Sequence, residues 1–317
     1  MAGSQRKQVV WLVLAIVPLG IVYGLRGSTE PKSVSAANVV QKPSLSQSAG
    51  MIRLPGGEFL MGTPRPSPDN QRPVHRVVLA PFWMNATHVT NEQFAEFVAE
   101  SSYRTSAEER GWSLVFNRET GAWDETPGVC WQHPTGAESS LAGKENYPVV
   151  HVSWFDAVAY ANWARKRLPT EAEHEFAARG GLSDAAFAWG RELNPDRQMR
   201  ANYWQGKHPL TNLAQDGFLE VSPTKAFPAN PYGFFDIAGN VASWCSDWYA
   251  ADAYGKSIAS KAAGPTTGTE RVLRGGSWHS TAEKGAGLHV GDRDSAPPEV
   301  TSSRIGFRCV RDIERGG

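Results

Sequence analysis

The stretch that decides the fold of this chain is residues 271–312, which read RVLRGGSWHSTAEKGAGLHVGDRDSAPPEVTSSRIGFRCVRD. Residues 271–274 alternate as a half-buried strand does, and the two glycines that follow allow a sharp turn or a close approach of another group. Residues 305–310 alternate in the same way, so we expect these two strands to pair. The long polar loop between them is the kind of segment in which functional sites are built.

Two motifs in this stretch, GGSW at 275–278 and GFRC at 306–309, resemble the closing signature of the formylglycine-generating enzyme family, the sulfatase-modifying factors. Two further segments, MIRLPGGEFLMG at 51–62 and RLPTEAEHEFAARGG at 167–181, are similar to other motifs of that family. The resemblance extends from Met51 to the end of the chain. It implies an α+β fold of the C-type-lectin-like kind, with little regular secondary structure, short helices and antiparallel strands.

The loop lacks the two cysteines that active members of this family carry. The corresponding positions hold Ser280 and Gly285. In the family, the two thiolates bind copper(I), a soft ion that prefers sulfur ligands, and oxygen activated there oxidises a cysteine of the substrate. A hydroxyl group and a hydrogen atom cannot take over that role. We therefore expect this chain to have kept the fold without this route to formylglycine.

The composition is that of a globular protein with many turns. The chain has 317 residues, and its 32 Lys and Arg residues balance its 32 Asp and Glu residues. Such a balance gives no sign of the basic surface that nucleic-acid binding requires, so no nucleic-acid partner is predicted. The 31 Gly, 21 Pro and 12 Trp residues indicate frequent turns and a core supplied by aromatic rings.

An uncharged apolar run, residues 9–25, follows Arg6 and Lys7 near the N-terminus. The run is long for a signal peptide and slightly short for a membrane span, and the cationic residues ahead of it place the N-terminus in the cytoplasm. We predict that residues 1–26 anchor the protein on the periplasmic side of the inner membrane. The alternative is a cleaved signal and release into the periplasm.

The remainder of the chain divides into two parts. Residues 27–50 are rich in Ser, Ala, Pro, Lys and Gln, which predicts a flexible tether. Residues 51–317 show neither an internal repeat nor a break in composition, so we expect a single sulfatase-modifying-factor-like domain there.

Three helix starts are marked by capping pairs, in which an N-cap hydroxyl accepts a hydrogen bond from the amide three residues later and that residue's side chain reaches back. The pairs are Thr90 with Gln93, Ser153 with Asp156, and Thr170 with Glu173. Gly180 and Gly181 mark the end of the third helix. His174, inside that helix, is interpreted as a packing residue.

The three cysteines, Cys130, Cys245 and Cys309, are few for an exported protein. An odd number leaves one thiol unpaired or bonded to another chain. In the family, the cysteine at the position of Cys309 pairs with a cysteine of a helix that here reads Ala159-Tyr160-Ala161, so its usual partner is missing. Cys309 pairs elsewhere or stays reduced. For Cys245 and Cys309 a structural role is expected, because they lie in or beside core-forming segments.

The resemblance also implies a structural calcium site, since calcium takes about six to eight oxygen ligands from carboxylates, amides and backbone carbonyls. The implied ligands are two side-chain and two backbone oxygens, from Asn202, Asp216, Tyr203 and Phe218. From the residues alone, hydrogen-bonded turns explain the Asn and the Asp equally well. A second family site uses the residue at Asn240, but Ser243 stands where that site has its carboxylate, so this second site is doubtful.

The polar loop offers further groups for chemistry, namely Ser277, Trp278, His279, Ser280, Glu283, Lys284, His289, Asp292, Arg293 and Asp294. His279, His289 and Asp294 are the residue types of a two-histidine, one-carboxylate iron site. Glu283 or His279 has the chemistry of a general acid or base. A chance grouping of polar residues is the alternative, because loops commonly carry them. The pattern requires neither iron nor copper.

Two functions fit these observations, and whether the protein is an enzyme stays open. The first is oxidative maturation or modification of a periplasmic protein or peptide by an oxidoreductase that does not use two cysteines. The resemblance extends to cysteine-poor members of this kind, such as a siderophore-maturation oxidase and accessory proteins of copper nitrite reductase. The second is a non-catalytic module that binds a peptide or protein on the same fold. Sulfatase activation is a third possibility, against which the missing thiols weigh.

Overall fold

The computed structural model describes residues 47–48, 50–64, 66–256, 264–283 and 286–313. Lys42–Gly317 form one compact unit. The predicted anchor and most of the predicted tether lie outside the described residues. Within the ranges above, no helix has the length and apolar character needed to cross a membrane.

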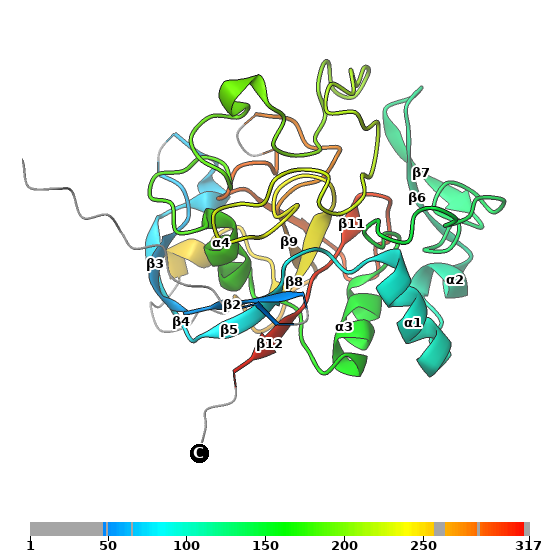
Figure 1. The fold of residues 1–317 in the computed structure, drawn as a ribbon, viewed down its shortest axis with the longest axis horizontal. Helices are drawn as coiled ribbons and strands as arrows, with labels where there is room; N and C mark the ends of the chain where they lie inside the picture. Colours follow the sequence, from blue (N-terminus) through cyan, green and yellow to red (C-terminus); the bar gives the residue numbers. More distant parts are fainter. Residues whose placement is uncertain (1–46, 49, 65, 257–263, 284–285, 314–317) are drawn as a thin grey trace, which may run out of the picture. The chain divides into compact units, whose positions relative to one another are not determined.

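One four-stranded antiparallel sheet joins the start of the domain to its end. Its strand order is β1-β2-β5-β12. The strands are β1 (Gln47–Ser48), β2 (Met51–Leu54), β5 (Phe82–Asn85) and β12 (Val310–Asp312). Met84 pairs with Ile52 on one side and with Val310 on the other, which places β12 beside β5 (Figure 1). The sheet begins inside the segment predicted to be a tether, because Ser48 pairs with Met51.

The second four-stranded sheet carries the loop of interest. Its order is β10-β9-β8-β11. The strands are β8 (Ala242–Trp248), β9 (Arg271–Arg274), β10 (Arg293–Ala296) and β11 (Ile305–Gly306). The prediction that residues 271–274 pair with residues 305–310 is wrong, because β8 lies between β9 and β11. Alternation shows that a segment is half-buried, but it does not show which strand lies beside it.

Residues 305–312 serve both sheets rather than one. Ile305 and Gly306 pair in parallel with β8, whereas residues 310–312 pair with β5. Phe307 and Cys309, between the two pairings, are fully buried. β10 was not expected either, because its sequence RDSA has no apolar alternation; it pairs antiparallel with β9 and closes the loop.

The remaining described elements are two hairpins and several short helices. The hairpins are β3 (Gly57–Met61) with β4 (His75–Leu79) and β6 (Trp112–Asn117) with β7 (Ala122–Pro127). The α-helices are α1 (Asn91–Ser101), α2 (Ser106–Arg110), α3 (Trp154–Trp163) and α4 (Glu171–Arg179). Short 3-10 turns are η1 (Asp69–Gln71), η2 (Pro195–Arg197) and η3 (Ala253–Lys256). The mixture is the α+β fold with short elements that was predicted.

The three predicted capping pairs are confirmed at the starts of α1, α3 and α4. Gly180 ends α4 in the left-handed conformation, with φ of 60°. A fourth capping box, Thr105 with Glu108, starts α2 and was not predicted. His174 is 1% exposed inside α4, in agreement with a packing role, and burial followed by the charge of Arg308 lowers its pKa well below the usual value.

All three cysteines are free and buried. Burial raises the pKa of the Cys130 thiol and raises that of Cys309 to about 12. Cys245 is fully enclosed, and burial, with Asp247 next, raises its pKa well above the ordinary value. These thiols are therefore protonated and sheltered at neutral pH, which makes them poor nucleophiles.

A maleimide or disulfide reagent is therefore expected to leave all three thiols of the native protein unlabelled over the time in which it labels all three in guanidinium. Mass spectrometry counts the labels. The unfolded sample is the control for reagent activity, and a native protein that labels as fast as the unfolded one would contradict the buried, reduced state.

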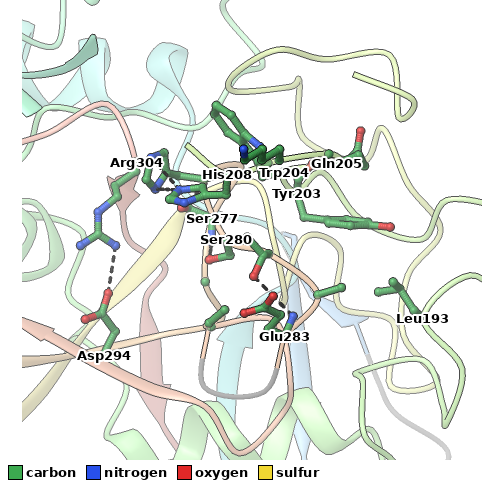
Figure 2. A pocket seen from close by; sticks show the side chains of 18 of the residues that line it. Leu193, Tyr203, Trp204, Gln205, His208, Ser277, Ser280, Glu283, Asp294 and Arg304 are labelled. Atoms are coloured by element: carbon green, nitrogen blue, oxygen red, sulfur yellow. Dashed lines mark hydrogen bonds and ion pairs between the residues drawn. The ribbon is translucent and has the colours of Figure 1, made fainter. Parts of the chain in front are cut away.

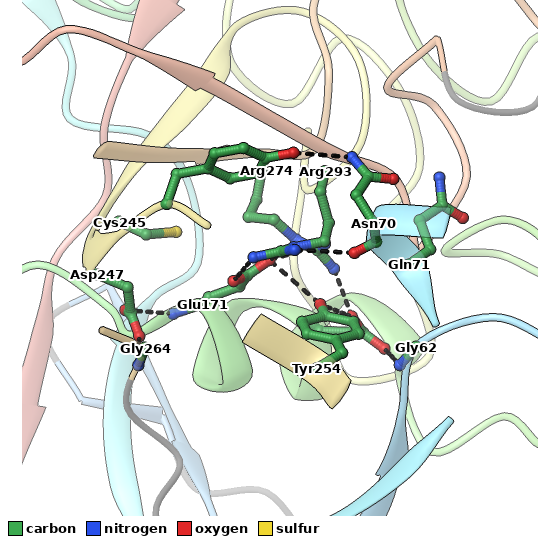
Figure 3. A network of polar contacts seen from close by, with 12 residues as sticks. Gly62, Asn70, Gln71, Glu171, Cys245, Asp247, Tyr254, Gly264, Arg274 and Arg293 are labelled. Carbon is green, nitrogen blue, oxygen red and sulfur yellow. Dashed lines mark hydrogen bonds and ion pairs between the residues drawn. The ribbon is translucent and has the colours of Figure 1, made fainter. Parts of the chain in front are cut away.

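A buried ionic network fastens α4 to the second sheet (Figure 3). Arg274 Nη2 donates to Glu175 Oε2 at 2.6 Å, and Arg293 Nε donates to Glu171 Oε1 at 2.6 Å. The side chains of Arg274 and Glu175 are 1% and 0% exposed. Arg274 also donates to the carbonyl of Val290 at 2.8 Å. The network thus holds both the start and the end of the β9–β10 loop against one helix.

Two buried carboxyl groups, those of Asp236 and Asp247, have raised pKa values and make the stability of the fold depend on pH. Burial raises the pKa of Asp236 to about 6, and burial together with Glu171 raises that of Asp247 to about 6, from an ordinary 3.8. Between these values the folded state holds a proton that the unfolded state has released, so stability falls as the pH rises through this window. A shift of roughly two units corresponds to about 3 kcal/mol for each group.

The free energy of unfolding is expected to decrease less between pH 4 and pH 6 in Asp247→Asn and in Asp236→Asn than in the unaltered protein, by up to about 3 kcal/mol each. Urea unfolding at several pH values measures the slope. Asp184→Asn, at a carboxylate that is 85% exposed, is the matched control. If the slopes of the buried variants equal that of the control, these two carboxyl groups do not titrate as inferred.

Candidate functional site

The β9–β10 loop begins with the two glycines singled out in the sequence. Gly275 and Gly276 have φ of 85° and 64°, in the left-handed region that favours glycine. A Cβ atom on Gly275 would lie 2.7 Å from the carbonyl oxygen of Ile237, and one on Gly276 would lie 2.6 Å from that of Gly287. Both positions therefore require glycine, as turn residues and as points of close backbone approach.

This loop forms one wall of a cavity of about 940 Å³. The segment from Tyr203 to His208 supplies another wall (Figure 2), and Trp123 and Arg304 also line the cavity. The loop residues that line the cavity include Ser277, His279, Ser280 and Glu283. None of the three cysteines is among its described lining residues.

Ser280 lies in this wall at the position where active relatives were expected to have their first cysteine. Its Oγ accepts a hydrogen bond from the Ser277 amide at 3.0 Å, and its own amide donates to the Ser277 carbonyl at 3.0 Å. The Trp204 amide donates to the Ser280 carbonyl at 2.8 Å. Ser280 is thus held in a tight turn that joins the two walls of the cavity.

His279 and His208 meet across the cavity wall. The distance between their Nε2 atoms is 3.2 Å, and the ring centroids are 4.4 Å apart. Burial, followed by the nearby His208 and Arg304, lowers the pKa of His279 to about 3. Burial also lowers the pKa of His208, against the opposing effect of Glu283. Both rings are neutral at pH 7.

The other candidates of the loop have different surroundings. Trp278 is fully buried and donates from Nε1 to the Ser303 carbonyl at 3.1 Å, so it anchors the loop. Glu283 is exposed at the cavity. Asp294 forms an ion pair with Arg304 at 2.9 Å. Lys284 and Gly285 lie outside the described residues.

The predicted grouping of His279, His289 and Asp294 is not found. His289 lines a second cavity, of about 800 Å³, where its ring stacks on Phe187 with centroids 4.6 Å apart. Its partner is Asp292, at 3.5 Å from Nδ1 to Oδ2. Among the described residues, no three His, Cys, Asp or Glu side chains form a group that could hold a metal ion. Position along the loop did not reveal that its two histidines face different cavities.

The four residues of the expected calcium site lie together at the back of the first cavity wall. Asp216 Oδ2 accepts from the Tyr203 amide at 3.1 Å and from Gln205 Nε2 at 2.7 Å, and its Oδ1 accepts from the Phe218 amide at 2.9 Å. Gln205 Nε2 also donates to the Tyr203 carbonyl. Asn202 Oδ1 is buried and has no hydrogen-bond partner. The unpaired Asn202 amide oxygen and the Asp216 carboxylate are oxygen types that a hard cation takes, and in the protein both Asp216 oxygens accept hydrogen bonds from backbone amides or Gln205.

The sequence profile of the Sulfatase-modifying factor enzyme 1-like domain matches residues 36–313. The chain belongs to this family. The formylglycine-generating enzyme of Streptomyces coelicolor is 43% identical over 302 residues, which are 90% of this chain and 96% of that protein. The inactive C-alpha-formylglycine-generating enzyme 2 of Bos taurus is 42% identical over 289 residues, covering 85% of this chain and 90% of that protein. Sequence identity therefore relates this family member about equally to proteins named as active and as inactive.

The fold comparison agrees with this assignment. The structure of PvdO from Pseudomonas aeruginosa superposes with a TM-score of 0.63 at 25% identity, covering 83% of this chain and 94% of that one. The structure of CarF gives a TM-score of 0.52 at 22% identity, covering 83% and 98%, which shows the fold alone.

The doubtful second calcium site of this sulfatase-modifying-factor family member does not fit a cation. Asn240 Oδ1 already accepts from the Ser222 amide at 2.9 Å and from Asn202 Nδ2 at 3.2 Å. Ser243 Oγ lies 2.8 Å from His88 Nε2. These oxygens are engaged within the protein, and Ser243 offers a hydroxyl group where the family site has a carboxylate.

Three residues of this family member's cavity escaped the sequence interpretation: His208, Trp204 and Arg304. Trp204 and His208 come from a loop that precedes residues 271–312, whereas Arg304 lies within that stretch, between β10 and β11, and no local motif marks any of the three. Only a search for histidines and aromatic residues in every loop would have included them, without indicating which ones meet.

Proposed function

We propose that this protein binds a peptide segment of an exported partner protein in the cavity around Ser280, and that it acts in the maturation of that partner. The observation that carries the proposal is the cavity itself, of about 940 Å³, with Ser280 in its wall. It keeps aromatic and polar walls suited to a peptide but offers no described thiol for the two-cysteine reaction. Leu210, Leu213 and Leu219, exposed by 59%, 57% and 49%, lie on or next to the loop that supplies one wall and suit an apolar partner surface.

A second candidate is oxidative modification of the bound partner. The observation that favours it is the neutral His208–His279 pair in the same cavity, which offers imidazole nitrogens to a proton or a metal ion. In that case a partner side chain loses two electrons and two protons, and dioxygen accepts them to form hydrogen peroxide. Binding alone leaves the partner's mass unchanged, whereas this reaction lowers it by the mass of two hydrogens.

The proposed place of action is the periplasmic side of the inner membrane. Support comes from the sequence, in which Arg6 and Lys7 precede the apolar run at 9–25. Protease digestion of intact cells, spheroplasts and lysed spheroplasts tests this orientation. The domain is expected to be digested in spheroplasts, and a domain digested only after the cytoplasm is opened would overturn the proposal.

The structural ion proposed for this protein is calcium, held by oxygens of Asn202, Tyr203, Asp216 and Phe218. The orphaned Asn202 Oδ1 and the Asp216 carboxylate support it. Because Tyr203 also lines the cavity, an ion there would stiffen the cavity wall.

Chelation of calcium is expected to lower the melting temperature by several degrees, since an ion at about 1,000 times its dissociation constant contributes about 4 kcal/mol. Asp216→Ala should melt at the lower temperature with or without calcium. Asp196→Ala, on an exposed turn, should keep the calcium response. A wild-type melting temperature that calcium and chelator leave unchanged would contradict the site.

The cavity proposal is tested by cross-linking. A photoreactive amino acid at Leu213 of the full chain is expected to capture a discrete partner in producing cells, and one at Val78, exposed on the β3–β4 hairpin, is not. Ser280→Trp, which places a large ring in the cavity wall, should abolish the capture, whereas Val78→Trp should leave it intact. Capture that persists with Ser280→Trp would overturn binding in the cavity. Once the partner is identified, the mass of its peptide from cells with this protein is compared with the mass from cells without it, which separates binding from oxidation.

A further inference from the structure

The contact between His208 and His279 has the spacing of two ligands on one metal ion. His208 Nε2 lies 3.2 Å from Nε2 and 3.4 Å from Nδ1 of His279. Imidazole nitrogens bind zinc at about 2.0–2.1 Å, so two of them on one tetrahedral ion lie roughly 3.3 Å apart. The Nε2–Nε2 separation of 3.2 Å is close to that value, and because Nδ1 of His279 is almost as near, at 3.4 Å, the exposed His208 ring has to move to direct both nitrogens at one ion.

The imidazole of His279 is held in place by a shell of aromatic rings. Ring centroids lie 4.4 Å away for Phe116, 5.1 Å for Trp123, 5.6 Å for Trp204 and 5.4 Å for Trp278. The backbone amide of His279 donates to Ser277 Oγ at 3.2 Å. A ring fixed in this way loses little freedom when it takes up a ligand.

The other side of the pair is open. His208 is exposed and lies in the loop that supplies another wall (Figure 2), and both histidines line the 940 Å³ cavity. Glu283, whose charge acts on His208, lines the same cavity. The positive charge of Arg304 is balanced by Asp294 at 2.9 Å. Space for water or for a donor atom of a partner therefore adjoins the two imidazole rings.

We propose that His208 and His279 form a binding site for a late first-row divalent metal ion, of the copper or zinc type, which faces the partner-binding cavity. Imidazole ligands suit these ions, and copper(II) binds most tightly in the series. With two protein ligands the ion keeps open coordination positions for water or for a side chain of the partner. The inference rests on the proposed function only in that both sites share one cavity. Metal binding can be measured in the absence of any partner.

The test is titration of the purified full-length protein with copper(II), followed by electron paramagnetic resonance. One equivalent is expected to bind with hyperfine coupling to two imidazole nitrogens. His208→Ala and His279→Ala should each weaken binding by about tenfold or more, since loss of even an indirect ligand support costs 10–100-fold. His75→Ala, at a histidine of the β3–β4 hairpin, is the matched control and should bind as the wild type does.

Thermal melting checks that each variant is folded. Since His208 is exposed, His208→Ala remains informative even if His279→Ala fails to fold. Unchanged copper binding in the double variant, or binding that His75→Ala also removes, would overturn the site and leave the pair as a contact between neutral rings. If Ser280→Trp loses cross-linking but keeps copper binding, the result supports the metal site independently of partner binding. If His208→Ala loses copper binding but keeps cross-linking, the result supports the peptide cavity independently of the metal site.

Discussion

A cysteine-containing peptide of the sulfatase type, incubated in air with the purified protein and copper, is expected to stay a thiol, with no aldehyde formed. The two-cysteine reaction needs a pair of thiolates, and this chain has Ser280 and Gly285 at those positions. A serine hydroxyl is a hard oxygen group that is not ionised at neutral pH and does not hold a soft ion as sulfur does. The three cysteines that the chain does have are buried.

Mass spectrometry of the peptide measures the outcome, and the formylglycine-generating enzyme of Streptomyces coelicolor, 43% identical, is the positive control. The variant with Ser280→Cys and Gly285→Cys places sulfur at both positions and is expected to gain affinity for copper(I). Conversion of the peptide by the unaltered protein would contradict the inference that this chain has kept the family's fold but lost its reaction.

The second large effect is expected in the buried ionic network. Arg274→Met should lower the free energy of unfolding by about 3–5 kcal/mol, because it leaves a buried charge without its partner. The Arg274 and Glu175 side chains are 1% and 0% exposed and meet at 2.6 Å. Glu175 keeps its contact with Arg179 at 2.5 Å, which places the expected loss toward the lower end of that range.

Chemical unfolding of Arg274→Met and of a control, Arg76→Met, tests this difference. Arg76 forms an ion pair with Glu58 in the β3–β4 hairpin, where the side chains are 65% and 48% exposed, and such a pair contributes roughly 0–1 kcal/mol. The two variants remove the same group from opposite environments. Equal losses would show that the network in Figure 3 contributes no more than a surface pair.

Arg274→Met should also loosen the β9–β10 loop, which forms part of the candidate site. Arg274 donates to the carbonyls of Val290 and Gly291 at the end of the β9–β10 loop, while its own strand leads into Gly275 at the start. Without these bonds the loop loses one of its fastenings to α4. The copper binding proposed for His279 therefore offers a second readout of Arg274→Met, in protein that remains folded.

Local interactions explain most of what could be predicted. A capping box such as Thr170 with Glu173 is made by neighbours in the chain, so its sequence pattern is sufficient. The turn at the glycines of the GGSW motif was predicted from their conformational freedom, whereas the α+β fold was implied by the resemblance to the family. The absence of cysteine at Ser280 and Gly285 is also a property of the sequence, and the chemistry of the side chains alone predicts the loss of the two-thiolate reaction.

The strand neighbours of β9 and the partner of His279 were decided only by the tertiary structure. β8 lies between β9 and β11, and His208 reaches His279 across 71 residues of chain. His279 and His289 are ten positions apart in one loop, yet they line different cavities. The physical reason is that alternation and residue type record whether a side chain is buried or polar, whereas pairing depends on how distant segments pack around a shared core.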